Sequence, residues 1–368
     1  MKEDDKYWHG YDGLQATKHS ILEKYLGGWF PILNRYNGKI IYLDTHAGRG
    51  YHDTGHRGSP IIALEQLLKR NDLERMLAKN EIIFVFFEIK KENCEILHEA
   101  INNLGPLPRG IRYSIKGCDF RAELTSILDN MDSRWSGLAP CFAFIDPFGF
   151  TLDMKLINRL LKQNKAEVFI NFMFRYVNMA IENQKDGETA LADNLDMLFG
   201  SENWREIQQI ESTEERAEAI VRFFKSSLEA KYVTYVKMYG ANRALKYVLF
   251  HATNHSAGRE LMIDSIWAAC PDGSFSAYER DNPEQLTLIT LDPNLKPLKQ
   301  RLQKEFAGQK VNMDEIYKWH WKTQVFKKKH LHEVIKELKD NNLIEIELFP
   351  DKRWGFKNIK EIRFSNGI

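Results

Sequence analysis

Four nearly continuous apolar runs constrain the fold more than any other feature of this sequence. The runs are KIIYLD, EIIFVFFE, CFAFID and AEVFINF, at residues 39–44, 81–88, 141–146 and 166–172. Such runs are typical of strands buried on both faces, as in a parallel sheet between helices. Segments with helical spacing separate them, and GIRYSIKG at 110–117 adds a fifth strand. The alternation predicts an α/β fold with a doubly wound sheet of five parallel strands.

After the strand at residues 166–172, the alternation of strands and helices stops. Residues 173–230 contain only helical patterns, which predicts a helical insertion. Residues 232–254 supply two strands around a short turn with Gly and Asn, which indicates an antiparallel hairpin. From about residue 295, three helical patterns precede two short strands, an order typical of a winged-helix-like module. We therefore predict one domain over residues 1–290, including the insertion, and a second over 291–368.

The composition is that of an ordinary globular protein. Of 368 residues, 43% are hydrophobic and 28% are charged, and no apolar run approaches the roughly 20 residues of a membrane span. The first residues, MKEDDKYWHG, are charged and do not resemble a signal peptide. The four scattered cysteines form no C-x-x-C pair, which argues against a metal site or a disulfide framework. These features favour a reducing, cytoplasmic location.

Positive charge is concentrated near the C-terminus. The net charge is +1, but residues 295–368 contain 17 Lys and Arg against 10 Asp and Glu. A basic module favours contact with a polyanion, and we expect nucleic acid, RNA rather than DNA. The candidate contacts lie at the third helix and in the hairpin turn: Lys327, Lys328, Lys329, Lys352 and Arg353. The alternatives are a solvated lysine-rich face and a protein-docking module.

The first strand ends in a small-residue turn, YLDTHAGRG, that carries Asp44, Gly48 and Gly50. In open α/β sheets such a turn presents backbone N–H groups to an anionic or polar cofactor. A dinucleotide cofactor is disfavoured because the G-x-G-x-x-G motif is incomplete. Gly48-Arg49-Gly50 is followed by Tyr51 and His52 and by no third glycine. An ordinary strand-to-helix turn is the alternative. The following helix is predicted to begin with Ser59 as its N-cap.

Three later strands also end at acidic residues, Glu88, Asp119 and Asp146. Ligands of open α/β sheets bind at the carboxyl ends of the strands, so these acids and Asp44 are expected at one crevice. Five parallel strands closed by a hairpin form the strand plan of Rossmann-like class I methyltransferases. For S-adenosyl-L-methionine, Glu88 suits the ribose hydroxyls and Asp119 the adenine amine. Each acid alone could instead be a helix N-cap or a solvated strand end.

The segment Asp146-Pro147-Phe148-Gly149-Phe150 follows the fourth strand. An exocyclic amine is a poor nucleophile because its lone pair is delocalised into the base. The Asp146 carboxylate and the Pro147 carbonyl can accept its N–H groups and localise the lone pair, while Phe148 or Phe150 holds the base flat. Such a pocket requires an unpaired or flipped base. The alternative is that Asp-Pro only ends a strand and both rings belong to the core.

The chain resembles two families. YLDTHAGRG, the Lys18-His19 pair, Gly58-Ser59-Pro60 and the Asp-Pro motif are similar to features of the large-subunit rRNA adenine-N6 methyltransferases, which carry DTHAG and DPPY. This resemblance implies that Lys18, His19, His46 and Ser59 join Asp44, Gly48, Gly50, Glu88 and Asp119 around the cofactor, with Asp146 as catalytic acceptor. DPFG replaces DPPY, and tRNA guanine-N2 dimethyltransferases have a similar DPFG, so the amine can be adenine N6, guanine N2 or another.

Nearly the whole chain, including FHATNHSAG from Phe250, more closely resembles the three-Cys-motif partner family, TcmP. Members of that family are encoded beside a protein with three clustered cysteines, which implies a protein partner. We therefore predict a methyltransferase of a nucleobase amine. The alternatives are a methyltransferase of a protein or peptide partner and a catalytically silent binding partner with the same fold.

Overall fold

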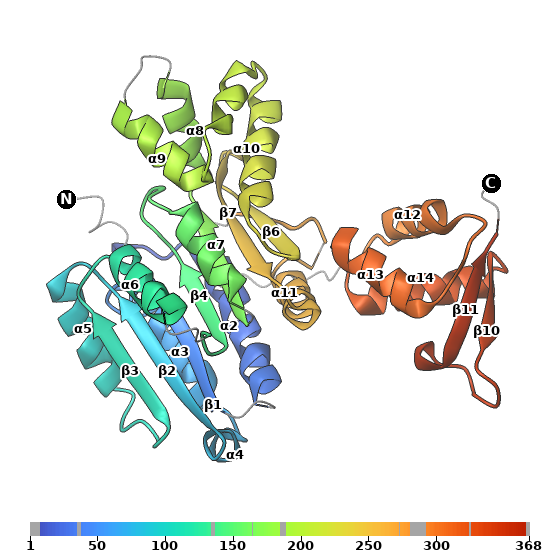
Figure 1. Ribbon diagram of the computed structural model, residues 1–368, viewed down its shortest axis with the longest axis horizontal. Helices are drawn as coiled ribbons and strands as arrows, with labels where there is room; N and C mark the ends of the chain where they lie inside the picture. Colours follow the sequence, from blue (N-terminus) through green and yellow to red (C-terminus); the bar gives the residue numbers. More distant parts are fainter. Residues whose placement is uncertain are drawn as a thin grey trace. The chain divides into compact units, whose positions relative to one another are not determined.

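The computed structural model divides into two compact units (Figure 1). It describes residues 8–34, 38–133, 137–163, 165–184, 189–271, 273–279, 292–323 and 325–365. The first unit comprises Met1–Ser265 and Ser276–Leu286, and the second comprises Ile266–Phe275 and Thr287–Ile368. The predicted boundary at residues 290 and 291 lies outside the described residues. Within the described ranges, no helix combines the length and the apolar character that a membrane crossing requires.

The first unit is built on an eight-stranded sheet in the order β3-β2-β1-β4-β5-β7-β6-β8. The strands are β1 (Gly38–Asp44), β2 (Asn80–Phe87), β3 (Ile111–Lys116), β4 (Cys141–Ile145), β5 (Ala166–Phe172), β6 (Tyr232–Tyr239), β7 (Leu245–Thr253) and β8 (Ser276–Tyr278). Strands β1 to β5 are mutually parallel, and β7 runs antiparallel to β5 and β6. This confirms the predicted α/β sheet. Strand β8, which pairs with β6, was not predicted because three residues carry no pattern.

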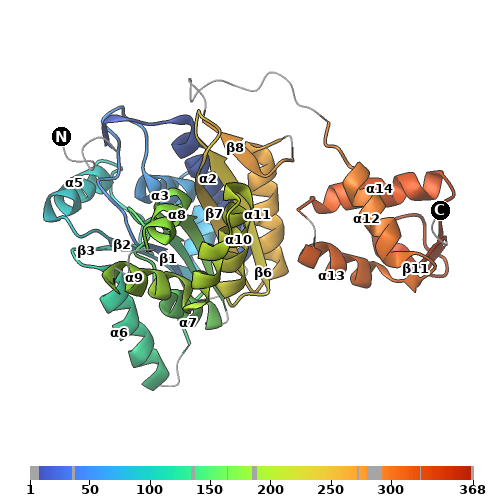
Figure 2. The ribbon, with the colours of Figure 1, turned by 90° about the horizontal axis from the view of Figure 1, so that it is seen from above.

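Helices cover both faces of the sheet (Figure 2). They are α2 (Gly13–Leu33), α3 (Ser59–Leu68), α4 (Leu73–Leu77), α5 (Lys91–Asn102), α6 (Phe120–Ser133), α7 (Met154–Lys162), α8 (Phe174–Asn183), α9 (Thr189–Phe199), η2 (Asn203–Gln209), α10 (Thr213–Ser227) and α11 (Ser256–Ala269). On one face, Tyr25 of α2 stacks on Phe142 of β4 at 5.0 Å. On the other face, the ring centres of Phe224 of α10 and Phe172 of β5 are 4.3 Å apart. Residues 173–230 therefore extend the helical layer of the second face.

Helix α2 is fixed to the sheet by a buried polar cluster. The Tyr25 hydroxyl donates a hydrogen bond to Glu167 of β5, and His251 Nε2 of β7 lies 3.1 Å from the same carboxylate oxygen. Lys18 lies seven residues before Tyr25 and therefore on the same face of the helix, since two turns span about seven residues. The cluster thereby directs Lys18 toward the sheet.

Helix α3 begins one residue earlier than predicted. Its N-cap is Gly58, and Ser59 is the first helical residue, so the prediction of Ser59 as N-cap was wrong. The Gly58 N–H donates a 2.6 Å hydrogen bond to the Gly50 carbonyl, and a Cβ atom at Gly58 would lie 3.0 Å from that oxygen. The close approach of the two backbones favours glycine at the cap. It also frees the Ser59 hydroxyl to bond elsewhere.

The second unit has the predicted order of three helices and a hairpin. Its elements are α12 (Lys296–Phe306), β9 (Lys310–Val311), α13 (Met313–Thr323), α14 (Lys328–Asp340), β10 (Ile344–Leu348), η3 (Phe356–Asn358) and β11 (Ile359–Phe364). The strands form a sheet in the order β10-β11-β9. Leu298 and Leu302 of α12 and Val334 of α14 are fully buried, so the unit has a core of its own. This confirms a winged-helix arrangement.

Candidate active site

Asp44, at the end of β1, is completely buried and holds the following turn together. Its carboxyl group accepts hydrogen bonds from the His46 N–H (3.2 Å), from the Tyr42 hydroxyl (3.4 Å) and from the Ser59 side chain. Burial raises the pKa of Asp44 to about 7, aided by the nearby Asp146 and opposed by these hydrogen bonds. Asp44 therefore shapes the turn from within and has no exposed surface of its own.

The turn itself brings Gly48 against Glu88. Gly48 has a φ of +64°, and its N–H donates a 3.0 Å hydrogen bond to Glu88 Oε2. The other oxygen of Glu88 accepts the Lys90 N–H at 2.8 Å. A Cβ atom on Gly48 would lie 2.3 Å from the ring of Trp8, so only glycine fits beneath that side chain. The half-buried Glu88 is thus joined directly to the glycine turn.

Asp146, directly after β4, is held by two side chains. Lys18 Nζ lies 2.5 Å from its Oδ2, and Asn171 Nδ2 donates to its Oδ1 at 2.6 Å. The side chains of Lys18 and Asp146 are only 4% and 13% exposed, so this ion pair is largely withdrawn from water. Lys18, predicted beside the cofactor, is therefore the partner of Asp146. Asn171 was not predicted, although it also stands at the end of a buried strand.

His46 connects the acids of separate strands. Burial lowers the pKa of His46 to about 4, against opposing effects of Asp146 and Asp119. The carboxylates after β3 and β4 therefore act on one imidazole in the turn after β1. Asp119 is additionally paired with Arg121, whose Nη2 lies 2.5 Å from its Oδ2. The side-chain hydrogen bond from Arg121 lowers the pKa of Asp119, against the effect of its partial burial.

The two rings of the Asp146 segment differ. Phe148 is 57% exposed, whereas Phe150 is partly buried and packs against the apolar core under α6 and α7. Pro147, which precedes Phe148, is buried. Phe148 is therefore the ring available to a substrate, and Phe150 is a core residue. Ile89, immediately after Glu88, is 68% exposed, which makes it a second apolar side chain at the sheet edge that the sequence pattern did not single out.

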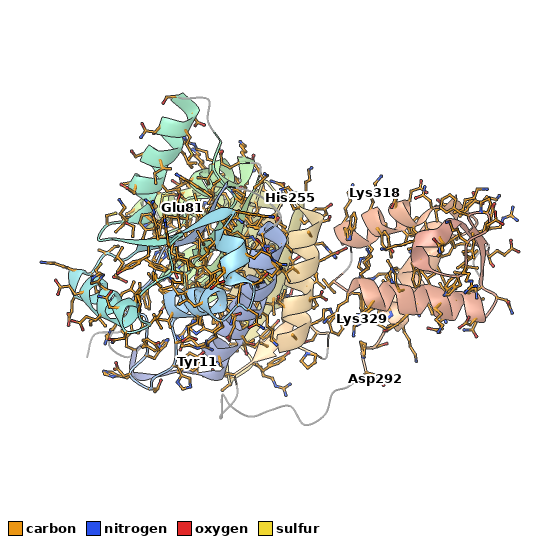
Figure 3. All side chains as sticks on the ribbon, turned by 90° about the horizontal axis from the view of Figure 1, so that it is seen from below. Tyr11, Glu81, His255, Asp292, Lys318 and Lys329 are labelled. Carbon is orange, nitrogen blue, oxygen red and sulfur yellow. The ribbon has the colours of Figure 1, made fainter. Side chains whose placement is uncertain are left out.

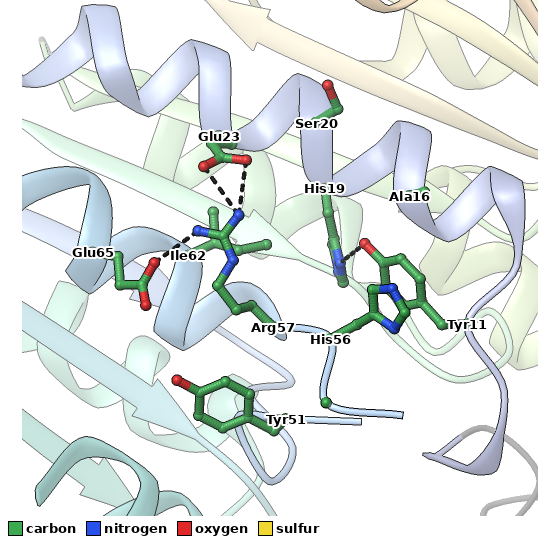
Figure 4. Close-up of a pocket in the computed structure, with 11 residues that line it drawn as sticks. Tyr11, Ala16, His19, Ser20, Glu23, Tyr51, His56, Arg57, Ile62 and Glu65 are labelled. Atoms are coloured by element: carbon green, nitrogen blue, oxygen red, sulfur yellow. Dashed lines mark hydrogen bonds and ion pairs between the residues drawn. The ribbon is translucent and has the colours of Figure 1, made fainter. Parts of the chain in front are cut away.

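His19 faces away from these residues. Adjacent positions on a helix point about 100° apart, and Lys18 and His19 lie on different faces of α2. His19 lines a separate pocket of about 420 Å³ between α2, α3 and residues 51–57 (Figure 4). Its Nδ1 lies 3.1 Å from the Tyr11 hydroxyl, and Arg57 on the opposite wall pairs with Glu23 and Glu65. Among the predicted site residues, His19 alone lines this pocket.

The predicted cations of the second unit are dispersed. Lys327 caps α14, and Lys328 Nζ lies 4.2 Å from the centre of the Tyr317 ring. Lys329 is exposed at one edge of the unit, whereas Lys318 of α13 lies at the opposite edge (Figure 3). Lys352 and Arg353 are exposed in the loop between β10 and β11. The five predicted residues therefore lie in two places, at the start of α14 and in the loop between β10 and β11.

Comparisons with known proteins match the two units separately. A family model described as a GMT-like wHTH domain matches residues 275–348, so the chain has a C-terminal winged helix-turn-helix domain. No curated protein matches the chain. In the first unit, five parallel strands followed by the antiparallel pair β7 and β6 form an α/β fold with a mostly parallel sheet.

Three solved structures illustrate that fold. Protein LPL1258 from Legionella pneumophila is 13% identical over 68% of this chain and 91% of its own, with a TM-score of 0.38. Trm1 from Pyrococcus horikoshii, solved with S-adenosyl-L-methionine, is 12% identical over 69% of this chain and 59% of its own, with a TM-score of 0.36. A SAM-dependent methyltransferase from Agrobacterium tumefaciens is 9% identical over 62% and 61%, with a TM-score of 0.30. These values are too low to assign any residue of this chain.

Proposed function

We propose that the chain is an S-adenosyl-L-methionine-dependent methyltransferase that acts on an exocyclic amine of a nucleobase in RNA or DNA. The observation that carries this proposal is the Asp146 carboxylate, fixed on both oxygens by Lys18 and Asn171 beside the turn that contains Asp44 and His46. A buried, charge-balanced acceptor at the carboxyl edge of a Rossmann-like sheet is suited to a polar reaction there.

The residues at the turn fit this cofactor. Gly48 and Gly50 have φ values of +64° and +88°, a left-handed backbone that glycine adopts without strain and that sets the course of the turn. Glu88 keeps lone pairs beyond the two N–H groups it accepts, and these suit the two hydroxyls of a ribose. The exposed Ile89 beside it suits the face of an adenine ring. Asp44 would act indirectly, by fixing Ser59 and the turn.

When bound, the cofactor supplies an electrophilic methyl group. Asp146 accepts N–H bonds from the target amine, which directs the nitrogen lone pair out of conjugation with the base. The Lys18 ammonium balances the carboxylate charge, and Asn171 fixes its rotation, so the acceptor does not reorganise when the amine arrives. The exposed Phe148 ring provides a surface on which the unpaired base can lie.

Binding of S-adenosylhomocysteine tests the cofactor assignment directly. We expect this product to raise the melting temperature of the protein and NAD to leave it unchanged. Replacing Glu88 with Ala should weaken binding by roughly tenfold or more, because a carboxylate that accepts ligand hydroxyls contributes about 1.5–3 kcal/mol. The measurement is titration calorimetry.

Glu92→Ala is the matched control, since Glu92 is an exposed carboxylate in the first turn of α5 near Glu88 in sequence. It should bind the product like the original protein. Equal stabilisation by NAD, or unchanged affinity after Glu88→Ala, would remove the basis for the assignment. Mass spectrometry of nucleosides from cells with and without the gene then identifies the modified base; a change confined to protein would favour the peptide-methylating alternative.

A further inference from the structure

Exposed aromatic rings and exposed cations are combined in the loop between β10 and β11, residues 349–358, which we call the wing loop. Phe349 is 48% exposed and Trp354 is 41% exposed. Lys352, Arg353 and Lys357 of the same loop are also exposed. An exposed tryptophan is costly in water and is enriched at binding surfaces. The wing loop therefore has the features of a contact surface.

Backbone hydrogen bonds hold the wing loop in one conformation. The Phe349 N–H donates to the Asn358 carbonyl at 2.9 Å, and the Lys352 N–H donates to the Phe349 carbonyl at 3.2 Å. The Asn358 side chain donates to the Arg353 carbonyl at 2.9 Å. Because the loop is already ordered, binding of a ligand does not carry the entropic cost of ordering it.

The cations of the wing loop are available to a ligand. Within the described residues of this unit, Lys352, Arg353 and Lys357 take part in no ion pair. On the flanking strands, by contrast, Lys360 pairs with Glu347 at 2.6 Å and Arg363 with Glu345 at 3.7 Å. The wing loop holds three exposed cations and one exposed acid, Asp351, so it has a surplus of positive charge on both sides of Trp354 in the sequence.

Helix α14 presents a different surface. Its exposed cations Lys329, Lys336 and Lys339 alternate with three exposed acids, Glu333, Glu337 and Asp340. Glu337 pairs with Lys299 at 2.6 Å, and Lys339 Nζ lies 4.7 Å from the centre of the Trp354 ring. A face with balanced charges repels phosphate about as much as it attracts it, so α14 is poorly suited to lie in a duplex groove.

We propose that the wing loop is a binding site for single-stranded nucleic acid, in which a base stacks on Trp354 and neighbouring phosphates contact Lys352, Arg353 and Lys357. Stacking on an aromatic ring needs an unpaired base, and it tolerates any sequence because every base has a π face. The Lys339 ammonium, which also pairs with Asp340 at 3.9 Å, lies over one face of the Trp354 ring, so the base stacks on the other face. This site goes beyond the proposed methyl transfer and does not depend on it.

Fluorescence anisotropy of the full-length protein tests the proposal. The probe is a labelled, unstructured RNA of roughly 12 nucleotides, compared with the duplex of the same sequence. We expect the single strand to bind more tightly than the duplex. Trp354→Ala should weaken single-strand binding by about tenfold or more, whereas Trp354→Phe should keep most of it. Lys352→Gln/Arg353→Gln/Lys357→Gln should weaken binding and reduce its salt dependence by about two released ions.

Lys336→Gln on α14 is the control and should leave single-strand binding within about twofold, since Lys336 lies among the exposed acids Glu333, Glu337 and Asp340. The melting temperature of each variant checks folding. The proposal is overturned if the duplex binds more tightly, if Trp354→Ala binds like the original protein, or if the α14 variant loses as much affinity as the wing variant. Absence of any binding, as expected of a protein-docking module, also overturns it; S-adenosylhomocysteine binding then still reports on the methyltransferase.

Discussion

Asp146→Ala is expected to reduce methyl transfer by about a thousandfold or more while S-adenosylhomocysteine binding stays within a few fold. In the proposed reaction the Asp146 carboxylate contacts the target amine and not the cofactor, so its loss removes the acceptor that localises the nitrogen lone pair. The same change removes the carboxylate that lies 2.5 Å from the Lys18 ammonium, whose side chain is 4% exposed. Removing one partner of a buried ion pair costs about 3 kcal/mol or more in the free energy of unfolding. The variant should therefore be both inactive and less stable.

A second substitution separates the two effects. Lys18→Met in the Asp146→Ala background removes the ammonium charge and fills a similar volume, so urea unfolding should show that most of the lost stability returns. Turnover should not return. Asp129→Ala is the surface control. The side chain of Asp129 is 62% exposed and pairs with Arg159, and exposed ion pairs contribute little to the free energy of unfolding. Full turnover by Asp146→Ala, or a double variant no more stable than the single one, would contradict the roles given to this pair.

The strands and their terminal acids could be predicted from the sequence because burial on both faces leaves a continuous apolar run. Parallel strands then bring their carboxyl ends to one edge, which is why Glu88 and the turn with Gly48 could be expected together. The hairpin was predictable for a similar reason, since two alternating runs flank a short Gly/Asn turn. Strand β8, with three residues, has too few positions to show any period.

Side-chain partners could not be predicted, because they depend on distances across the fold. Lys18 and Asp146 are 128 positions apart, and only the tilt of α2 over the sheet joins them. Lys18 and His19 are adjacent in sequence, but neighbouring residues on a helix point in different directions. Their separation could be predicted only once the buried face of α2 was known. Phe148 and Phe150 are the same residue type in the same short segment, so the sequence does not distinguish them. Only the packing shows that Phe150 contacts the core and that Phe148 is exposed.

Asp44→Asn is expected to stabilise the protein, and to do so increasingly as the pH rises from 4 to 7. Burial raises the pKa of Asp44 from 3.8 to about 7. A carboxyl group whose folded pKa is raised contributes stability that is complete below the unfolded pKa and is lost as the pH rises to the folded one. Asparagine stays neutral throughout, so the advantage of Asp44→Asn should grow by roughly 3 kcal/mol between pH 5 and pH 8.

Asp119→Asn provides a control of opposite sign. Arg121 lowers the pKa of Asp119, so this carboxylate contributes stability that is present above its unfolded pKa and is lost only at strongly acidic pH. Asp119→Asn should therefore reduce stability by the same amount at pH 5 and at pH 8. Urea unfolding at both pH values measures the two variants in parallel. If Asp44→Asn changed stability equally at both, Asp44 would be charged in the folded turn throughout, and the hydrogen bonds from Ser59 and His46 would outweigh its burial.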